Sequence, residues 1–425
     1  MPNAWSRRQW LSYLAGLGMA ARALPAQAAW WNDQRQRLKL AFIDPLTGPA
    51  GDIGRHCLHS WQYIAEGLGR VEPHASALRI DLAPFDNSAS PRESLKALKV
   101  AIDQGFRIIL QGNGSGVTAA LAAAIDRHNL RNPADPVILI NYASMDPALT
   151  RGQCSPWHYR VDADTAMKVQ ALSRYLEEDT VHRSVYLLNQ NYAHGQQVSA
   201  YAQQALSRRQ GMQVVGDELH VPFVLGSFDK QVEKIRESGA TALITANWGA
   251  DLRRLVDSLH AVDYPLAVFT YYGSLMGTPG ALASKQVNSR LDVFQVSGFH
   301  SSHPGPWPAF QEKFRRRFDE DFVTFACVDG MQMLLRAVRA AGSTRVSALV
   351  PHLEGIRFDG HDGVVSMRAS DHQLIRPVYV SRWVPVSKAY PHDCESTGFT
   401  FAPVRKFNAG EMNLPAQCDM TLQQG

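Results

Sequence analysis

Short apolar segments typical of β-strands alternate with segments typical of amphipathic helices along most of this chain. In a first series, strands are expected at 38–43, 78–83, 107–110 and 137–140, and helices at 54–67, 91–103 and 117–128. After Arg160 a second series has helices at 166–178, 195–209, 228–238 and 251–262, and strands at 184–188, 213–217, 242–245 and 266–270. Such alternation predicts an α/β protein of two lobes, each a parallel sheet flanked by helices. Parallel sheets bind ligands at the carboxyl ends of their strands, so two facing lobes would enclose a ligand between them.

The turn Gly112-Asn-Gly-Ser-Gly116 joins a predicted strand to a predicted helix. Glycines allow close approach to the backbone, and the first NH groups of a helix favour an anionic or electron-rich group, which makes Gly114, Ser115 and Gly116 candidate ligand contacts. The alternative is a tight turn in which Ser115 only caps the helix. The spacing differs from the dinucleotide fingerprint, because the third glycine comes one residue early, and no Lys-Ser/Thr pair of a phosphate loop follows.

The N-terminus predicts export. Ser6-Arg-Arg-Gln-Trp-Leu11 precedes a short apolar stretch at 12–20, and Ala26-Gln-Ala28 supplies a small-x-small cleavage site. This pattern is typical of a twin-arginine signal peptide at 1–28, with a mature chain that begins near Ala29. No later segment approaches the roughly 20 apolar residues of a membrane span. We therefore expect a soluble periplasmic protein.

Composition and net charge limit the kinds of partner that this chain is expected to bind. The chain has 425 residues, of which 45% are hydrophobic and 19% charged, and this is ordinary for a globular protein. The net charge of +4 is small, and the basic run Arg315-Arg-Arg317 lies beside Glu312, Asp319 and Glu320. These features favour a solvated helix face, and no nucleic-acid partner is expected.

The sequence also contains no recognised catalytic, metal-binding or cofactor-binding motif. His56 and His59 lack a Cys-x-x-Cys partner, and His300-Ser-Ser-His303 before Pro304 is more typical of a turn than of a dyad. Neither a Gly-x-Ser-x-Gly elbow nor a His-Glu-x-x-His helix occurs in the sequence. The expectation is a protein that is not an enzyme and that uses no cofactor and no metal.

Five cysteines are an odd number for an oxidising compartment, so at least one is expected to be free or to pair between chains. Cys394 and Cys418 bracket a C-terminal tail that shows little periodicity. A cross-link there would hold the tail in place, and this pair is the predicted disulfide.

Several short motifs together resemble the periplasmic solute-binding proteins of ABC importers, in the type I, branched-chain amino-acid (Leu/Ile/Val-binding) receptor group. The motifs occur in that family's order across nearly the whole mature chain: Ile43-Asp-Pro-Leu-Thr-Gly-Pro49, Ser115-Gly-Val-Thr-Ala-Ala120, Ala143-Ser-Met-Asp-Pro-Ala-Leu-Thr150, Tyr159-Arg-Val-Asp162, Tyr192-Ala-His-Gly195 and Phe228-Asp-Lys-Gln-Val-Glu-Lys-Ile235. The resemblance implies three hinge crossovers, with lobe 1 at 29–160 and 274–352 and lobe 2 at 161–273 and 353–425. It also implies closure of the lobes on a small solute and delivery to a membrane permease with its ATPase subunits.

The same resemblance implies which residues meet the ligand. In the family, a ligand carboxylate is held by the serine turn and the loop that here reads Asn141-Tyr-Ala-Ser-Met145. The anchors carried over are Ser115, Gly116, Ala143 and Met145. The family's second hydroxyl falls on Met145, which has only its backbone to offer, so the cradle is retained in part.

On the opposing lobe, the family places an aromatic residue where this chain has Trp248, and an acid for the ligand ammonium within Thr270-Tyr-Tyr-Gly-Ser274, which has none. A buried ammonium without an anion is costly, and this counts against a standard amino acid. Asp52 or Asp251 would supply the charge if the register differed by one or two residues.

Aromatic surface replaces the missing acid. Trp248, Tyr271, Tyr272 and Tyr142 are candidates to stack on a flat ligand or surround a cation, although strand-end aromatics also commonly belong to the core. Asn191, in a loop after a strand of lobe 2, is a further candidate with its neighbours Tyr192 and His194; the alternative is an ordinary loop that caps the next helix.

Three functions remain open from the sequence. The leading one is an ABC-importer receptor for a small amino-acid-like or aromatic or unsaturated carboxylate. The second is an extracytoplasmic sensor that uses the same clamp to signal to a partner protein. A secreted hydrolase is a distant third.

Overall fold

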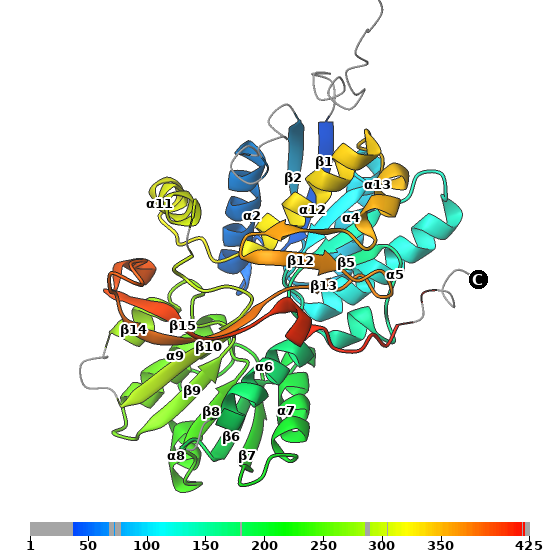
Figure 1. The fold of residues 1–425 in the computed structure, drawn as a ribbon. Helices are drawn as coiled ribbons and strands as arrows, with labels where there is room; N and C mark the ends of the chain where they lie inside the picture. The colour runs from blue at the N-terminus through cyan, green and yellow to red at the C-terminus, as the bar shows by residue number, and fades with distance from the viewer. Residues whose placement is uncertain are drawn as a thin grey trace, which may run out of the picture.

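The computed structural model describes residues 37–67, 72, 78–178, 181–284, 290–303, 305–418 and 420. The predicted signal peptide at 1–28 lies outside these residues. The described chain forms two lobes, one above the other (Figure 1). Among the helices of the described ranges, none combines the length and apolar character needed to cross a bilayer.

Lobe 1 is built on a five-stranded parallel sheet with the order β2-β1-β3-β4-β5. Its strands are β1 (Arg37–Asp44), β2 (Arg79–Asp86), β3 (Ile108–Gln111), β4 (Ile138–Asn141) and β5 (His158–Arg160). Its helices are α2 (Gly51–Glu66), α4 (Pro91–Asp103), α5 (Ser115–Arg131), α11 (Trp307–Phe318), α12 (Phe325–Ala341), α13 (Val346–Leu353) and the 3₁₀ helix η4 (Pro147–Thr150). Every residue of β3 and β4 is buried, as expected for central strands covered on both faces.

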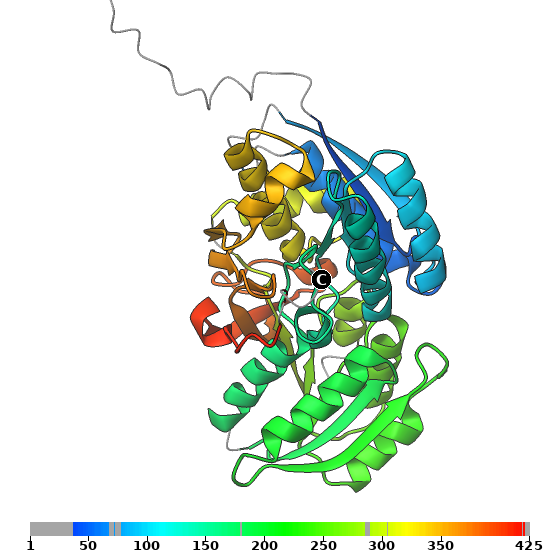
Figure 2. The same cartoon turned by 90° about the vertical axis from the view of Figure 1, so that its right-hand side faces the viewer.

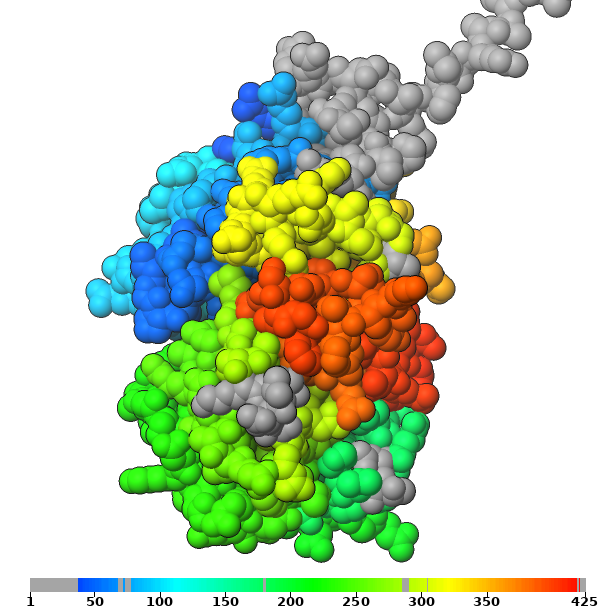
Figure 3. Space-filling model, turned by 90° about the vertical axis from the view of Figure 1, so that its left-hand side faces the viewer, coloured from blue at the N-terminus to red at the C-terminus, as the bar shows by residue number. Residues whose placement is uncertain are grey.

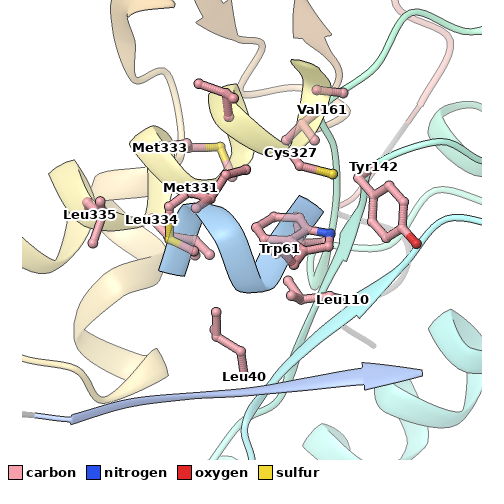
Figure 4. Close-up of a cluster of buried hydrophobic side chains, with 14 of the residues drawn as sticks. Leu40, Trp61, Leu110, Tyr142, Val161, Cys327, Met331, Met333, Leu334 and Leu335 are labelled. Carbon is pink, nitrogen blue, oxygen red and sulfur yellow. The ribbon is translucent and has the colours of Figure 1, made fainter. Parts of the chain in front are cut away.

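Two hydrophobic clusters hold the helices of lobe 1 on opposite faces of its sheet. One face packs on α4 and α5. The other packs on α2, α11, α12 and α13, and Figure 4 shows its centre, where Trp61 of α2 lies between Leu110 and the methionines of α12. The ring of Trp61 meets that of Tyr142 edge-on, with centroids 5.8 Å apart.

Lobe 2 is built on a seven-stranded sheet with the order β15-β14-β10-β9-β8-β6-β7. Its strands are β6 (Ser184–Gln190), β7 (Gln213–His220), β8 (Ala242–Thr245), β9 (Leu266–Thr270), β10 (Leu291–Ser297), β14 (Val378–Pro385) and β15 (Phe399–Phe407). Its helices are α6 (Thr165–Glu178), α7 (Ala193–Leu206), α8 (Asp229–Glu237), α9 (Gly249–His260), α10 (Thr278–Ala283), and the 3₁₀ helices η6 (Cys394–Ser396) and η7 (Ala409–Met412). Strands β6 to β10 are parallel, whereas β14 and β15 add antiparallel to the edge.

The predicted fold class is confirmed. Helix α4 and strands β8 and β9 have the predicted bounds, and the other expected elements are found within a few residues of theirs. The C-terminal tail is more regular than expected, because β14 and β15 pair along their lengths between 378 and 407. Figure 2 shows lobe 1 in blue, cyan and yellow above the green lobe 2.

The lobe boundaries differ from the expectation in two places. Strand β10 lies within 274–352, which was assigned to lobe 1, but it pairs with β9 and β14 in the sheet of lobe 2. The small antiparallel sheet of β11 (Arg357–Gly360), β12 (Gly363–Met367) and β13 (Leu374–Ile375) was assigned to lobe 2, but its apolar side chains pack into the core of lobe 1. The chain therefore crosses between the lobes near 161–164, 298–303 and 376–377. On the face shown in Figure 3, the orange and red C-terminal segments lie between the two lobes.

The predicted disulfide between Cys394 and Cys418 is wrong. Cys418 is bonded to Cys154, with the Cα atoms 5.9 Å apart, and Cys394 is a buried free thiol. Strand β15 carries the chain away between Cys394 and Cys418, and the returning tail passes the η4 region of lobe 1 where Cys154 lies. The bond ties the tail at Cys418 to lobe 1.

Candidate functional site

The buried side chain of Asp44 holds the turn between β3 and α5 in place. Asp44, at the end of β1, accepts hydrogen bonds of 3.0 Å from the main-chain nitrogens of Gly112 and Asn113. It also accepts one from the hydroxyl of Tyr142. A Cβ at Gly112 would lie 2.4 Å from the Tyr142 ring, and Gly114 has a φ of +97°, so both positions require glycine. Ser115 begins α5, where the first main-chain NH groups have no partner within the helix, whereas the NH of Val117 already donates to the main-chain oxygen of Gly114 at 3.0 Å.

This turn lines a cavity that both lobes enclose, which we call the turn cavity. From lobe 1 it is lined by Gly114, Ser115 and the loop after β4, and from lobe 2 by aromatic rings. The full lining is Ile53, Gly112, Asn113, Gly114, Ser115, Ala143, Ser144, Met145, Tyr192, His194, Trp248, Tyr272 and Leu275. None of these residues carries a carboxylate.

A second cavity adjoins the first on the side of the crossovers, and we call it the hinge cavity. The two share Ala143, Met145, Tyr272 and Leu275. The hinge cavity is also lined by three charged side chains, Asp162, Lys168 and Arg376. Lys168 Nζ lies 2.9 Å from Asp162, and Arg376 lies 3.6 Å from it. Burial alone would raise the pKa of Asp162, but Lys168 and Arg376 outweigh burial and lower it, so this carboxylate is ionised and already paired.

The aromatic side of the turn cavity is a connected group, the aromatic wall, formed by Tyr192, Trp248 and Tyr272. The indole nitrogen of Trp248 donates a 2.9 Å hydrogen bond to the Tyr192 hydroxyl. The ring of Phe223 meets Trp248 edge-on at 5.0 Å and supports it from behind. Burial raises the pKa of both tyrosines well above the usual value, so they remain neutral hydrogen-bonding groups.

His194 joins the aromatic wall to the loop after β4. Its ring lies 5.8 Å from that of Tyr272, and its Nδ1 lies 2.9 Å from the Thr165 hydroxyl. That hydroxyl donates to the main-chain oxygen of Met145, so Nδ1 must donate to the hydroxyl and Nε2 must be the unprotonated nitrogen. Burial lowers the pKa of His194 to about 3, which keeps the ring neutral. Nε2 is buried and has no partner among the described residues, so it can accept a hydrogen bond from a ligand.

The structure brings most of the predicted ligand contacts together. Gly114, Ser115, Ala143, Met145, Trp248 and Tyr272 line the turn cavity, and Tyr271 lines the hinge cavity. Two backbone groups of the predicted cradle are already used: the Ala143 nitrogen donates to Asn141 at 3.2 Å, and the Met145 oxygen accepts from Thr165. Gly116 lies in the first turn of α5 but outside the lining of either cavity.

Two predicted contacts have other positions. Tyr142 presents only its ring to the hinge cavity, because its hydroxyl is bonded to Asp44 and the side chain belongs to the core of lobe 1. Asn191 is exposed and accepts a 2.9 Å hydrogen bond from Gln196, and it lines neither cavity. Its neighbours Tyr192 and His194 occupy the place expected for it.

Asp52 and Asp251, the acids expected near the ligand if the register differed, both lie outside the lining of the turn cavity. Asp52 is exposed and paired with Arg55, and it lines an outer groove. Asp251 is fully buried and accepts hydrogen bonds from Gln190 and from the main-chain nitrogen of Phe223. Neither can pair with an ammonium group in the turn cavity.

Sequence reasoning missed Asp44, Asp162, Lys168 and Arg376. Two of them had a weak local signal. Lys168 stands in the first turn of a helix, where a positive charge opposes the helix dipole, and Arg376 interrupts the apolar run from Leu374 to Val380. A charge in such a position needs a partner, although the sequence does not say which one.

Comparison with known proteins identifies the relatives of this chain. The sequence model of the family described as "Periplasmic binding protein" matches residues 37–389. The chain belongs to the periplasmic binding protein family. Leu/Ile/Val-binding protein homolog 4 of Brucella abortus (strain 2308) is 25% identical over 421 residues, which cover 96% of this chain and 97% of the relative. The predicted resemblance to branched-chain amino-acid receptors and the predicted class of solute-binding protein are thereby confirmed, and the sensor and hydrolase alternatives are not favoured.

Solved structures of periplasmic binding proteins show the same fold. A leucine-, isoleucine-, valine-, threonine- and alanine-binding protein from Brucella ovis, in its closed conformation, superposes with a TM-score of 0.78 at 23% identity, over 90% of this chain and 97% of that one. A solute-binding protein of an ABC transporter from Rhodopseudomonas palustris BisB5, in complex with 3,4-dihydroxybenzoic acid, gives a TM-score of 0.72 at 16% identity, over 88% and 98% of the two chains.

Proposed function

We propose that this periplasmic binding protein captures a small carboxylate with a flat, unsaturated body and delivers it to the permease and ATPase subunits of an ABC importer. One observation carries the proposal. The serine turn and the aromatic wall line the same cavity, and the described lining contains no carboxylate. A ligand would place its anionic end at Ser115 and the start of α5, and its flat body against Trp248 and Tyr272.

The charges argue against a standard amino acid as the preferred ligand. An α-ammonium group in the turn cavity would lack an anionic partner, and an unpaired buried charge is strongly unfavourable. Asp162 lies in the adjoining cavity, but Lys168 and Arg376 already neutralise it. A ligand without an ammonium group meets no such penalty.

Unpaired polar atoms add a hydrogen-bonding requirement. His194 Nε2, the Tyr271 hydroxyl and the Ser274 hydroxyl are buried in the two cavities without partners among the described residues. A hydroxyl on the ring of the ligand would satisfy His194. The R. palustris relative, which binds 3,4-dihydroxybenzoic acid, supports this ligand class, since the fold accommodates such a molecule.

Contacts between the lobes support capture by closure. Thr165 of lobe 2 donates to the main-chain oxygen of Met145, and Gln197 donates to Asp146. Both bonds join lobe 2 to lobe 1 and would form as the lobes close on a ligand. No step of this cycle changes the ligand covalently, so we expect binding without turnover, after export directed by residues 1–28.

A thermal-shift panel tests the proposal. We expect 3,4-dihydroxybenzoate or a related aromatic carboxylate to raise the melting temperature more than leucine, isoleucine or valine does, because a ligand stabilises the state that it binds. The ligand should be recovered unchanged, and Ser115→Leu should abolish the shift while Ser207→Leu, on the exposed end of α7, should not. A shift given by aliphatic amino acids and not by aromatic acids would contradict the proposed ligand class.

A further inference from the structure

Two buried histidines and a carboxylate come together at the second crossover. His300 and His303 lie in the loop between β10 and α11, and Asp362 lies in the turn between β11 and β12. One ligand atom from each of the three lies within 4.8 Å of the others. We propose that His300, His303 and Asp362 form a binding site for a divalent transition-metal ion of the zinc class.

The first argument is the state of the imidazole nitrogens. His303 is 2% exposed, yet neither of its nitrogens has a hydrogen-bond partner among the described residues, and Nδ1 of His300 also has none. Each unsatisfied buried polar atom costs about 1–3 kcal/mol. The two rings are neighbours, with centroids 4.2 Å apart, and His303 Nδ1 lies 3.9 Å from Asp362, too far for a hydrogen bond. An ion between these groups would take one ligand atom from each of the three residues, and so would satisfy one nitrogen of each ring.

The second argument is the chemistry of the donors. Imidazole nitrogen and carboxylate oxygen are ordinary ligands of Zn²⁺, and three protein ligands leave a position for water. A histidine must be neutral to bind a metal. Burial lowers the pKa of His300 to about 4 and also lowers that of His303, so both rings are neutral at the pH of the periplasm.

A metal ion at this site would have to compete with the charged groups around it. Lys406 Nζ lies 3.2 Å from Asp362, but its side chain is 41% exposed and can turn to solvent. His361, 5.1 Å from His303, is bound to Asp329, which also pairs with Arg376. Among the described residues, the carboxylate of Asp362 is therefore paired only with the half-exposed Lys406, which a metal ion could displace.

A second cluster of possible metal ligands has donor atoms that are already paired. Asp321, His392 and Cys394 also lie within 4.8 Å of one another. Asp321 is already paired with Arg315 and accepts from the main-chain nitrogen of Glu395, and the Cys394 thiol contacts Ser301. Because its donors have partners, this cluster carries no proposal.

Metal binding to tag-free protein, first stripped with a chelator, tests the site. We expect equilibrium dialysis with Zn²⁺, followed by elemental analysis, to give one tightly bound ion per chain. His300→Gln and His303→Gln should each weaken binding by more than about tenfold, since even outer-shell changes at metal sites cost that much. His352→Gln, on the exposed face of α13, should bind as the wild type does.

Lys406→Gln is a variant that should raise the affinity for zinc, whereas the histidine variants should lower it. Removing the competing ammonium should tighten zinc binding, and the fold of each variant is checked by circular dichroism in chelator. The proposal is overturned if the wild-type protein shows no saturable zinc binding, if both histidine variants bind zinc as tightly as wild type, or if Lys406→Gln weakens binding.

Discussion

The guanidinium of Arg376 donates a 2.9 Å hydrogen bond to the main-chain oxygen of Gly298. A second bond, of 3.0 Å, reaches the main-chain oxygen of Val161. These three residues lie at the three crossovers between the lobes, so one buried side chain joins all of them. Asp162 and Asp329, at 3.6 and 3.3 Å, balance its charge.

Replacement of Arg376 should destabilise the protein strongly. Arg376→Met leaves the buried carboxylate of Asp329 with its hydrogen bonds to His361 but without the guanidinium, and breaking a buried ion pair costs about 3–5 kcal/mol. Arg382→Met is the matched control, because its pair with Asp292 is half exposed and such pairs contribute about 0–1 kcal/mol. Urea unfolding of both variants measures the difference. Equal, small losses would show that Arg376 does not hold the hinge together.

The disulfide gives a second prediction. Cys418→Ser should lower the free energy of unfolding by about 2–5 kcal/mol, because the bond closes a long loop, and reduction of the wild type should do the same. Cys394→Ser should leave the disulfide intact. Peptide mapping without reduction should recover Cys154 joined to Cys418. A peptide that joins Cys394 to Cys418 would instead restore the pairing expected from the sequence.

Much of the fold was predictable because local periodicity reports burial. The runs Ala242–Thr245 and Leu266–Thr270 are continuous and apolar, as central parallel strands require, and both have the expected bounds. Periodicity does not say which sheet a strand joins, and the segment that forms β10 was not predicted as a strand but was included in 274–352, which the resemblance assigned to lobe 1. Likewise, Cys154 and Cys418 are 264 residues apart, and nothing local distinguishes this pair from the others.

The candidate site was predictable where function follows from position at a strand end. Ser115 follows a parallel strand and was therefore expected at the cleft, whereas Trp248 was expected there because the family resemblance implies an aromatic residue after the strand at 242–245. Asp44 also follows a strand, but its role depends on the Tyr142 hydroxyl and the Gly112 nitrogen, which meet only in the folded protein. The pairing of Lys168 with Asp162 is tertiary in the same sense, since it depends on how α6 packs against the first crossover.

Asp44 should make stability depend on pH. Burial raises its pKa to about 7, although hydrogen bonds from Tyr142, Asn113 and Gly112 oppose this effect. The folded protein then holds a proton that the unfolded chain releases above its ordinary pKa of about 4, so this group's contribution to stability falls as the pH rises from 4 to 7.

Comparison with Asp44→Asn isolates that contribution, because buried histidines with lowered pKa values act in the opposite direction. The stability of the wild type relative to the variant should decline toward pH 7, with a slope of up to about 1.4 kcal/mol per pH unit for one proton. Urea unfolding at several pH values measures it. Parallel profiles for the two proteins would mean that Asp44 does not titrate in this range.

His194 should select for a hydroxyl group on the ligand. In His194→Phe the acceptor Nε2 is lost while an aromatic ring remains, so affinity for 3,4-dihydroxybenzoate should fall by about five- to tenfold, the size of one hydrogen bond. Affinity for benzoate, which has no hydroxyl, should change little. Fluorescence titration with both acids measures the ratio, and a parallel loss for both would indicate that His194 only shapes the cavity.

The most direct test of the account is isothermal titration calorimetry of 3,4-dihydroxybenzoate and leucine with the wild type, Trp248→Ala and Tyr390→Ala. The account predicts tighter binding of the aromatic acid than of leucine. Loss of the Trp248 ring should cost about 2 kcal/mol or more of binding free energy, as for other central aromatic contacts. Tyr390, which lines neither cavity, serves as the control. Undiminished binding to Trp248→Ala, or preference for leucine, would contradict a cleft in which the serine turn and the aromatic wall hold a flat carboxylate.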